Sequence, residues 1–379
     1  MPAAVVDTYV GYIKDEEEEG GYEVAARRIT DLNEFYSASA ALLNCGEEEV
    51  AFVESASRGW ALAFYSFPFK AGDRIITSAA DYGSNFIGYL HARNRWGAEV
   101  VVIGDDEHGD LDMNMLRKNS AHPQARLICM SHIPTGGGRV IDARSVGLIA
   151  NEFGLAFYLD ACQSVGVIHC DVKEIGCHVL SATGRKFLRG PRGSGLLFIR
   201  NDLINQLEPC MLDQHGALLQ SETSYSAVAG ARRLEMWEYN CAAKAALAVA
   251  INYALHQRLA SGKIARRVLC LGGYLRARLS SLHHVHLTDI GTNLCGIVTF
   301  IVDGFTPHAI HEHFKKRGIN SSVSGAASGG SRVWFDRRGL KDVLRISPHY
   351  YNTQQELDAV IEALGHSKEA LTHSIACRV

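Results

Sequence analysis

The chain of 379 residues is predicted to fold as an α/β protein, with a mainly parallel sheet covered by helices and a smaller α+β part towards its C-terminus. Three observations predict this class. Short β-rich segments alternate with helical stretches from about residue 50 to residue 200. After about Arg233 the pattern changes to an alanine-rich helical stretch, followed by a second set of strands and helices. The length also exceeds what a single hydrophobic core usually fills, which indicates two domains.

The elements are predicted in chain order as follows. The opening is expected to be a helix over residues 1–20, broken by Gly20-Gly21, that packs against the smaller domain. The first set of segments comprises an apolar run at 50–53, strands at 74–77, 100–104, 125–130, 155–159, 179–182 and 195–200, and helices at 85–96 and 143–153. The second set comprises helical stretches at 242–259, 307–317 and 354–364, strands at 296–302 and 344–347, and a mobile loop at 324–331. We place the large domain at residues 1–250 and the small domain at 251–379.

Bulk composition disfavours several classes of function. The net charge is −3 and the lysines and arginines are scattered, so neither nucleic acid nor an anionic membrane is an expected partner. No apolar stretch approaches the roughly 20 residues that span a bilayer, and the start lacks a secretory signal. The ten cysteines are dispersed without a Cys-x-x-Cys motif, which predicts reduced thiols, a cytoplasmic location and no zinc site. Three histidines, His308, His311 and His313, lie close together on a predicted helix. They are interpreted as part of a solvated helix face and not as a metal site.

A carboxylate and a lysine follow two of the predicted strands. Asp160 ends the apolar run 155–159, and Lys186 comes after strand 179–182 in a turn of small residues. Ligands of open α/β sheets bind beyond the carboxyl ends of the strands. A lysine can form a Schiff base with pyridoxal 5'-phosphate, and a carboxylate can keep its pyridine nitrogen protonated. The pair therefore predicts a pyridoxal-phosphate enzyme, although Asp160 alone could cap a helix and Lys186 alone could be solvated.

Phosphate-binding residues are predicted at two places. Ser55, Ala56 and Ser57 follow the apolar run 50–53 and enter a helix, where backbone N–H groups and the helix dipole favour an anion. Ordinary N-capping is the alternative for this segment. Thr183 and Arg185 lie beside Lys186, where a hydroxyl and a guanidinium can also bind phosphate.

Two further side chains could contact the ring of the cofactor. Tyr82 follows strand 74–77 and could stack on a flat cofactor, although a buried core tyrosine is the alternative. Gln163 comes three residues after Asp160 and could donate to a phenolic oxygen, whereas its alternative is an exposed polar residue. The order phosphate loop, aromatic residue, carboxylate and lysine is much more specific than any one of its parts.

With this order of residues the chain resembles the class V aminotransferases, a pyridoxal-phosphate group of fold type I that includes cysteine desulfurases, isopenicillin N epimerase and carbon–sulfur lyases. The resemblance runs from about residue 3 to about residue 366 and is strongest at 160–163, 183–193 and 345–353. It implies a large domain with a mainly parallel seven-stranded sheet and a smaller α+β C-terminal domain.

The resemblance also implies a role for each matching position. Lys186 would carry the cofactor and move the substrate α-proton, Asp160 would pair with the pyridine nitrogen, and Arg345 would grip the substrate carboxylate. The other implied cofactor-binding residues are Ser55, Ala56, Ser57, Tyr82, Thr135, Gln163, Thr183, Arg185, Tyr239 and Asn240. The last two belong to a segment that reaches the partner subunit's phosphate in relatives, which implies a homodimer with shared active sites.

Three departures from the family pattern affect the expected chemistry. Desulfurases carry a nucleophilic cysteine in the loop that corresponds to 324–331, and this chain has none there. Arg185 replaces a histidine that is common in desulfurases, as in the lyase- and epimerase-like branch. Relatives carry some tens of residues before the position of Met1-Pro2, which indicates a truncated chain or an altered pocket.

We therefore expect an enzyme that is not a typical cysteine desulfurase. It would act on an amino acid through an external aldimine and Cα-proton abstraction, with β-elimination from a cysteine conjugate as the reaction. An aminotransferase or an amino-acid epimerase is the alternative, because the same α-proton step serves all three. A non-catalytic protein is disfavoured because Lys186, Asp160 and Arg345 are all present. A nucleotide-dependent oxidoreductase is disfavoured too, since the run 136–138 lacks the Gly-x-Gly-x-x-Gly pattern.

Overall fold

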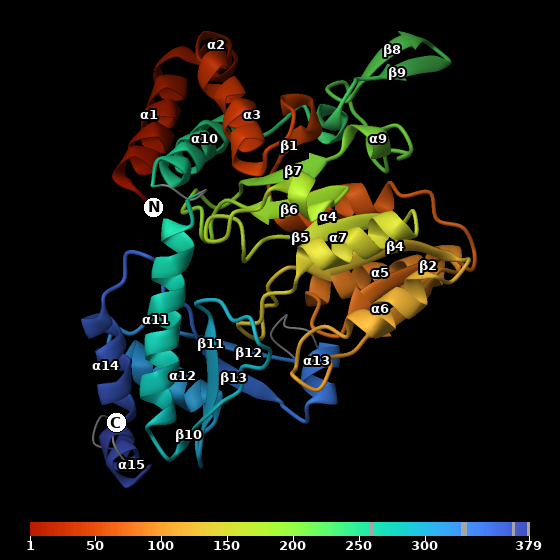
Figure 1. Cartoon of the computed structure of the whole chain (residues 1–379). Coiled ribbons are helices and arrows are strands. Elements are labelled where there is room, and N and C mark those ends of the chain that lie inside the picture. The colour runs from red at the N-terminus through yellow and green to blue at the C-terminus, as the bar shows by residue number, and fades with distance from the viewer. Residues whose placement is uncertain (258–260, 327–331, 366–367, 377–379) are drawn as a thin grey trace.

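The computed structural model describes all residues except 258–260, 327–331, 366–367 and 377–379 (Figure 1). A seven-stranded sheet forms the centre of the larger part, in the order β1-β7-β6-β5-β4-β2-β3. Its strands are β1 Val50–Val53, β2 Arg74–Ser78, β3 Glu99–Ile103, β4 Ala125–Ser131, β5 Ala156–Asp160, β6 Val179–Thr183 and β7 Gly195–Ile199. Strand β7 is antiparallel to both neighbours and the other pairs are parallel, which confirms the predicted fold class.

Both faces of this sheet are buried, and for this reason its strands are nearly continuous apolar runs. Alternate residues enter different hydrophobic clusters: Phe157 and Leu159 of β5 face one cluster, while Tyr158 faces the other. Helices α4 Ala56–Tyr65 and α5 Gly83–Trp96 supply the cluster around Tyr158. Helices α6 Met113–Ser120 and α7 Ala143–Glu152 supply the opposite one. Short helices α8 Val172–Ile175 and α9 Asn201–Ile204 complete the connections.

The N-terminal helices pack against the larger part. They are α1 Ala3–Glu19, α2 Gly21–Arg27 and α3 Ile29–Leu43. Buried Tyr12 of α1 clusters with Ala242 and Ala245 of α10 Cys241–His256. Packing of helix 1–20 with the small domain stays a prediction. The break predicted at Gly20 is confirmed, since this glycine ends α1 with a φ of 100°.

A second, four-stranded antiparallel sheet forms the smaller part, in the order β10-β11-β13-β12. Its strands are β10 Val285–Leu287, β11 Val298–Val302, β12 Ser322–Gly325 and β13 Asp342–Ile346. Its helices are α11 Lys263–Ser280, α12 Pro307–Lys315, α13 Arg332–Arg337, α14 Gln354–Leu364 and α15 Lys368–Ala376. The loop expected at 324–331 begins later than predicted, because Ser324 and Gly325 pair with β13; residues 327–331 lie outside the described residues. The division at 250/251 stays a prediction, and α10 spans it.

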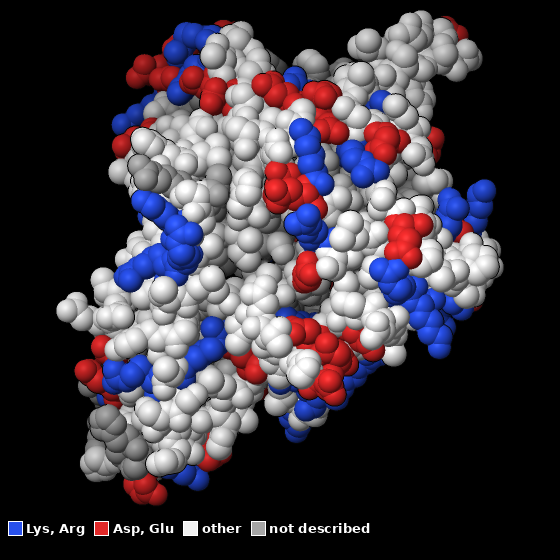
Figure 2. Space-filling model, in the orientation of Figure 1, with Lys and Arg blue, Asp and Glu red and all other residues white. Residues whose placement is uncertain are grey.

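Two surface features bear on function. A hairpin of β8 Ala217–Ser221 and β9 Ser224–Ala227, which was not expected from the sequence, projects from the larger part (Figure 1). The 3₁₀ helix η2 Ala231–Leu234 follows this hairpin in the chain, and another, η1 Glu47–Glu49, precedes β1. Figure 2 shows acidic and basic side chains mixed over the visible face, without a continuous basic stripe. Among the described helices, none is both long and apolar enough to cross a bilayer.

Candidate active site

A cavity opens at the carboxyl ends of β4, β5 and β6 and gathers most of the predicted site residues. It is lined by Ser55, Ala56, Ser57, Tyr82, Ser131, Ile133, Thr135, Asp160, Cys162, Gln163, Thr183, Arg185 and Lys186. Ser131, Ile133 and Cys162 were not predicted from the sequence. Arg345, Tyr239 and Asn240 were predicted and do not line this cavity.

Strand register explains why residues distant in the chain meet here. In the parallel part of the sheet Ser131 of β4 pairs with Asp160 of β5, which pairs with Ser181 of β6. All three strands therefore end at the same edge, and Lys186 lies in the turn directly after β6. The sheet thus brings a carboxylate and a lysine together without a contribution from the smaller part.

The N-terminus of α4 supplies the phosphate side of the cavity. Ser55 is the N-cap in an extended conformation, and its Oγ accepts a hydrogen bond of 3.1 Å from the Arg58 backbone N–H. The first backbone N–H groups of a helix have no intrahelical partner and carry the positive end of the dipole. Ala56 and Ser57 are at this end and line the cavity, which is the arrangement that a phosphate requires.

Asp160 is buried, with 7% of its surface exposed. Its Oδ1 accepts a hydrogen bond of 3.0 Å from the Cys162 N–H, and its Oδ2 accepts one of 2.9 Å from Asn85 Nδ2. Asn85 comes from the first turn of α5 and was missed as a site residue, since nothing in the sequence shows that this turn faces β5. Each carboxylate oxygen can accept a further hydrogen bond, so Asp160 can also accept one from a protonated pyridine nitrogen.

Lys186 lies in the cavity without a hydrogen bond from its amine to any residue that the structure describes. Burial lowers the pKa of Lys186, assisted by the positive charges of Arg185 and Arg345, while Cys162 and Asp160 oppose the shift. A lowered pKa increases the fraction of neutral amine, which is the form that reacts with a carbonyl group.

Gln163 provides a direct test of whether the cavity fits pyridoxal phosphate. Its side chain is 6% exposed, and Nε2 has no hydrogen-bond partner among the described residues. A buried amide without a partner costs free energy, so a ligand with an acceptor at this place would stabilise it. The phenolic oxygen of pyridoxal phosphate is such an acceptor. The unpartnered amide, the unpartnered amine and the helix N-terminus together fit this cofactor.

A second buried carboxylate, Asp81, contacts Tyr82 and Ser131, which line the cavity. This residue was not predicted as part of the site. It accepts hydrogen bonds from Thr77 Oγ1 at 2.8 Å, Tyr89 OH at 2.6 Å and the Tyr82 N–H at 2.8 Å, and it also contacts Ser131 Oγ. Burial raises the pKa of Asp81 to about 6, although these hydrogen bonds oppose the shift. Asp81 therefore fixes the backbone that presents Tyr82 to the cavity.

Arg345 belongs to β13 of the smaller part and contacts Thr135, a residue that lines the cavity. Its Nη1 donates a hydrogen bond of 3.0 Å to the Thr135 carbonyl, and its Nε is buried without a partner among the described residues. Burial lowers the pKa of Arg345, a shift to which the charge of Arg185 also contributes. The unpartnered Nε leaves Arg345 able to bind a carboxylate next to the cavity.

The glycine run 136–138 allows the smaller part to approach this loop. A Cβ at Gly136 would lie 2.7 Å from Phe335, and one at Gly138 would lie 2.2 Å from the Ile297 carbonyl oxygen. Larger residues would push the smaller part away from Thr135. The run therefore serves close packing, which accounts for glycines that do not form a nucleotide-binding motif.

Tyr239 and Asn240 lie away from the cavity of the same chain. Asn240 caps α10 by accepting a hydrogen bond of 2.7 Å from the Ala243 N–H, and it donates one of 3.1 Å to Tyr9 OH. The Tyr239 ring packs on Phe52 with 5.7 Å between ring centroids. Their predicted role concerns the site of a partner subunit and stays a prediction.

Comparisons with known proteins identify a family and a fold. The family model of aminotransferase class-V matches residues 1–360. A probable cysteine desulfurase of Methanothermobacter thermautotrophicus is 27% identical over 369 residues, which cover 96% of this chain and 91% of that protein. The apo structure of a cysteine desulfurase from Thermococcus onnurineus has a TM-score of 0.89 at 23% identity and covers 98% of this chain and 92% of that one. A complex of the cystine C–S lyase C-DES with its reaction product cysteine persulfide has a TM-score of 0.84 at 18% identity, with coverage of 96% and 94%.

One expectation is wrong in the light of these relatives. We expected an enzyme that is not a typical cysteine desulfurase, yet further curated relatives are also named cysteine desulfurases or probable ones. The expectation relied on the missing cysteine at 324–331, of which residues 327–331 lie outside the described residues. A single position in one loop carries less weight than similarity over the whole chain.

Proposed function

The chain belongs to the class V aminotransferase family of pyridoxal-phosphate enzymes, and we propose that its reaction cleaves the C–S bond of cysteine or a cysteine-derived amino acid. The observation that carries the proposal is the set of unsatisfied groups in one cavity: the Lys186 amine and the Gln163 amide, beside the Asp160 carboxylate. An ordinary exposed role would not leave the Gln163 amide buried and unpaired.

Pyridoxal phosphate, when bound, supplies an electron sink for the charge left on the substrate Cα. In our proposal Asp160 supplies the negative charge that keeps the pyridine nitrogen protonated, and the N-terminus of α4 binds the phosphate. Arg345 binds the substrate carboxylate, which orients the Cα–H bond. The Lys186 amine then takes the proton from Cα and can return it to another atom.

Cleavage of the C–S bond by elimination gives a balanced reaction with water. The Cα–H electron pair forms a carbon–carbon double bond, the Cβ–S bond breaks, and the sulfur leaves as a thiolate that takes up a proton. Hydrolysis then releases ammonium and pyruvate, so that one cysteine conjugate and one water yield one thiol, one pyruvate and one ammonium ion.

The printed names of similar proteins support chemistry at sulfur. The curated relatives are named cysteine desulfurases, and the structurally similar C-DES is described as a cystine C–S lyase. Transamination and epimerisation would use the same proton transfer at Cα. These reactions are therefore alternative outcomes of the test below.

We also propose that the chain is a homodimer, with residues 237–240 near the partner's phosphate. The projecting hairpin supports this, because Leu218, Leu219 and Tyr225 are 59%, 83% and 58% exposed. A two-stranded hairpin is marginally stable alone, and grouped exposed apolar residues mark interfaces. Light scattering should give the mass of two chains for the wild type. L219D should shift the measured mass towards that of a single chain.

The functional test uses the protein loaded with pyridoxal phosphate and a panel of L-cysteine, L-cystine, an S-alkyl cysteine and L-alanine. The proposal predicts sulfide, persulfide or thiol together with pyruvate from the sulfur compounds only. The loss of activity in K186A, with activity retained in K118A at an exposed lysine of α6, would support it. Amino-group exchange with a keto acid or racemisation, without sulfur release, would contradict it.

A further inference from the structure

The turn that starts at Lys186 contains an arginine in the left-handed conformation. Arg189 has a φ of 62°, which L residues other than glycine rarely adopt. Its backbone N–H donates a hydrogen bond of 3.0 Å to the Lys186 carbonyl. Arg189 thus closes the turn on which Lys186 is placed. A strained residue of this kind persists only where its surroundings hold it.

Tyrosines from two other elements hold the Arg189 side chain. Its Nη1 donates a hydrogen bond of 3.0 Å to Tyr350 OH, and its Cζ lies 4.7 Å from the centroid of the Tyr351 ring. The ring of Tyr253 on α10 lies 5.8 Å from the same atom. Cation–π contacts at these distances are attractive. Tyr350 and Tyr351 lie between β13 and α14, a few residues after Arg345.

His349 makes a second link to the same turn. Its Nε2 lies 3.2 Å from the Phe187 carbonyl oxygen, and its Nδ1 lies 2.9 Å from the Tyr350 backbone nitrogen. Because a backbone N–H can only donate, Nδ1 accepts and Nε2 carries the proton that is donated to Phe187. Burial lowers the pKa of His349 to about 4, which agrees with this neutral form.

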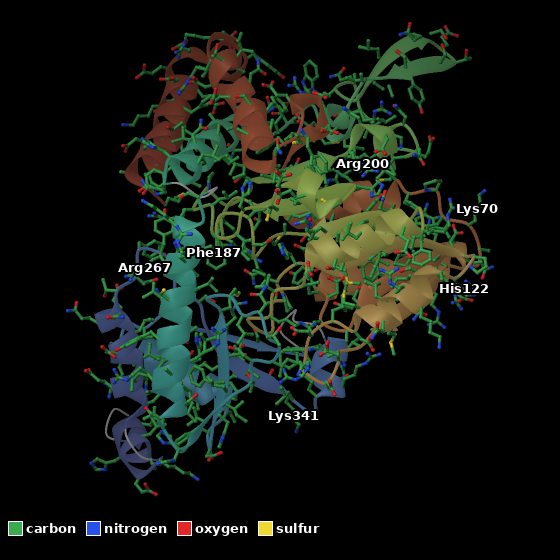
Figure 3. All side chains as sticks on the ribbon, in the orientation of Figure 1. Lys70, His122, Phe187, Arg200, Arg267 and Lys341 are labelled. Atoms are coloured by element: carbon green, nitrogen blue, oxygen red, sulfur yellow. The ribbon has the colours of Figure 1, made fainter. Side chains whose placement is uncertain are left out.

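The Phe187 backbone also packs closely against Gly166. Gly166 lies against it so closely that a Cβ there would be 2.5 Å from the Phe187 carbonyl carbon. Figure 3 shows Phe187 in the region between the large sheet and helix α11. His349, which is four residues after Arg345 in the chain, therefore contacts a closely packed segment that begins one residue after Lys186.

We propose that His349 is a positioning residue, which fixes the Lys186 amine relative to the substrate carboxylate on Arg345 by holding the Phe187 carbonyl. Arg189 and Tyr350 support the same connection between the two parts of the molecule. The proposal rests on the roles proposed above for Lys186 and Arg345. It assigns His349 no contact with the substrate or the cofactor.

The chain offers a matched control for this claim. His284 is as buried as His349, each with 6% of its surface exposed, and its Nε2 lies 3.3 Å from the Leu364 carbonyl oxygen. It lies between α11 and β10 of the smaller part and, among the described residues, has no hydrogen bond to the turn after Lys186. Loss of its imidazole should affect stability in the same way without changing the position of Lys186.

The experiment compares H349A, H349Q and H284A in the protein loaded with pyridoxal phosphate. Amide hydrogen exchange of peptides that cover residues 184–190 is measured first, because it requires no turnover. H349A should accelerate exchange there, H349Q should restore most of the protection because its amide can donate to the same carbonyl, and H284A should leave these peptides unchanged. Unchanged exchange in H349A, or an equal acceleration in H284A, would overturn the proposal.

Kinetics provide the second measurement, with H349Q available if H349A does not fold. H349A should lower kcat by about a hundredfold at little change in KM, because a displaced lysine loses its alignment while Arg345 still binds the substrate. H349Q should recover most of kcat. Equal kcat values for H349A and H284A would contradict the positioning role. A wild-type protein without C–S cleavage contradicts only the proposed function, since the exchange result stands independently.

Discussion

Two sites in the described part of the chain each combine a carboxylate with a lysine, Glu235 with Lys244 and Asp160 with Lys186, and they differ in whether their hydrogen bonds are satisfied. Lys244 Nζ lies 2.6 Å from Tyr36 OH and 3.5 Å from Glu235 Oε2, and both charged residues are 3% exposed. The Lys186 amine faces a cavity beside Asp160 and has no hydrogen bond to any of the described residues. Burial lowers the pKa of both lysines. The first pair is saturated and stabilises the fold, whereas the second is left for a ligand.

Further hydrogen bonds satisfy both oxygens of the Glu235 carboxylate. Its Oε1 accepts a hydrogen bond of 2.7 Å from the Phe52 N–H of β1, and Tyr36 OH donates to the same carboxylate at 2.9 Å. Burial acts to raise the pKa of Glu235, but hydrogen bonds and the nearby charge of Lys244 hold it below its usual range. Burial and charge alone therefore do not identify a ligand-binding site. Hydrogen-bond donors that lack a partner and lie next to a cavity do identify one.

The largest expected effect comes from K186A, which removes the unsatisfied lysine. C–S cleavage should fall by about 10⁴-fold, because proton transfer by a positioned group alone contributes up to this factor. The visible absorbance band of lysine-bound pyridoxal phosphate should disappear, while the melting temperature should stay close to that of the wild type. Retention of both band and activity would remove Lys186 from the site.

K244M should have the opposite effect to K186A, because it should lower stability and leave activity almost unchanged. It leaves Glu235 buried without its cation, which should lower the free energy of unfolding by about 3–5 kcal/mol. Activity per folded molecule should stay within about a factor of two. Denaturant titration is the measurement, and the double variant E235Q/K244M should regain part of the lost stability because no buried charge remains unpaired. A fully active and fully stable K244M would refute the structural assignment.

Asp81 sharpens the comparison because it is buried like Glu235 but forms no ion pair within the described part of the chain. Its folded pKa of about 6 exceeds its usual value of 3.8. The folded protein therefore holds this proton more tightly, and the stabilisation present below pH 3.8 is lost as the pH rises to about 6. The difference in pKa corresponds to about 3 kcal/mol. From pH 4 to pH 7 the unfolding free energy of the wild type should fall by this amount relative to D81N.

The smallest effect is expected for N85A, which removes one of the two hydrogen bonds to Asp160. A hydrogen bond to a charged group contributes about 1.5 kcal/mol or more, so kcat/KM should fall about tenfold. N119A on the exposed side of α6, where the amide donates only to the Met115 carbonyl, should leave kcat/KM unchanged. An equal effect of both substitutions would show that Asn85 does not act through Asp160.

The sequence was sufficient to predict the centre of the site because that centre depends on local patterns. Strand β5 was expected at 155–159 and spans Ala156–Asp160, and Lys186 follows β6 as expected. Parallel strands end at one edge whatever the details of packing. Asp160, Gln163 and Lys186 could therefore be placed in one cavity from the apolar runs that precede them.

The rest of the site depends on tertiary contacts that leave no local signal. Asn85 lies in the first turn of α5 and Asp81 just before this helix, and only the packing of this region on the sheet brings Asn85 to Asp160 and Asp81 to Ser131. Lys244 lies in an alanine-rich helix, where a lysine in sequence alone indicates a solvated face. The hairpin β8–β9 was missed because its turn, Ser221-Glu222-Thr223-Ser224, lacks glycine and proline.

The most direct test is to find which lysine carries the cofactor. The protein would be incubated with pyridoxal phosphate, reduced with borohydride so that the bond to lysine becomes permanent, digested, and mapped by mass spectrometry. The account predicts the pyridoxyl group on Lys186 and none on the buried Lys244, whose pKa burial also lowers. A label on Lys244 or on another lysine, with Lys186 unmodified, would contradict it.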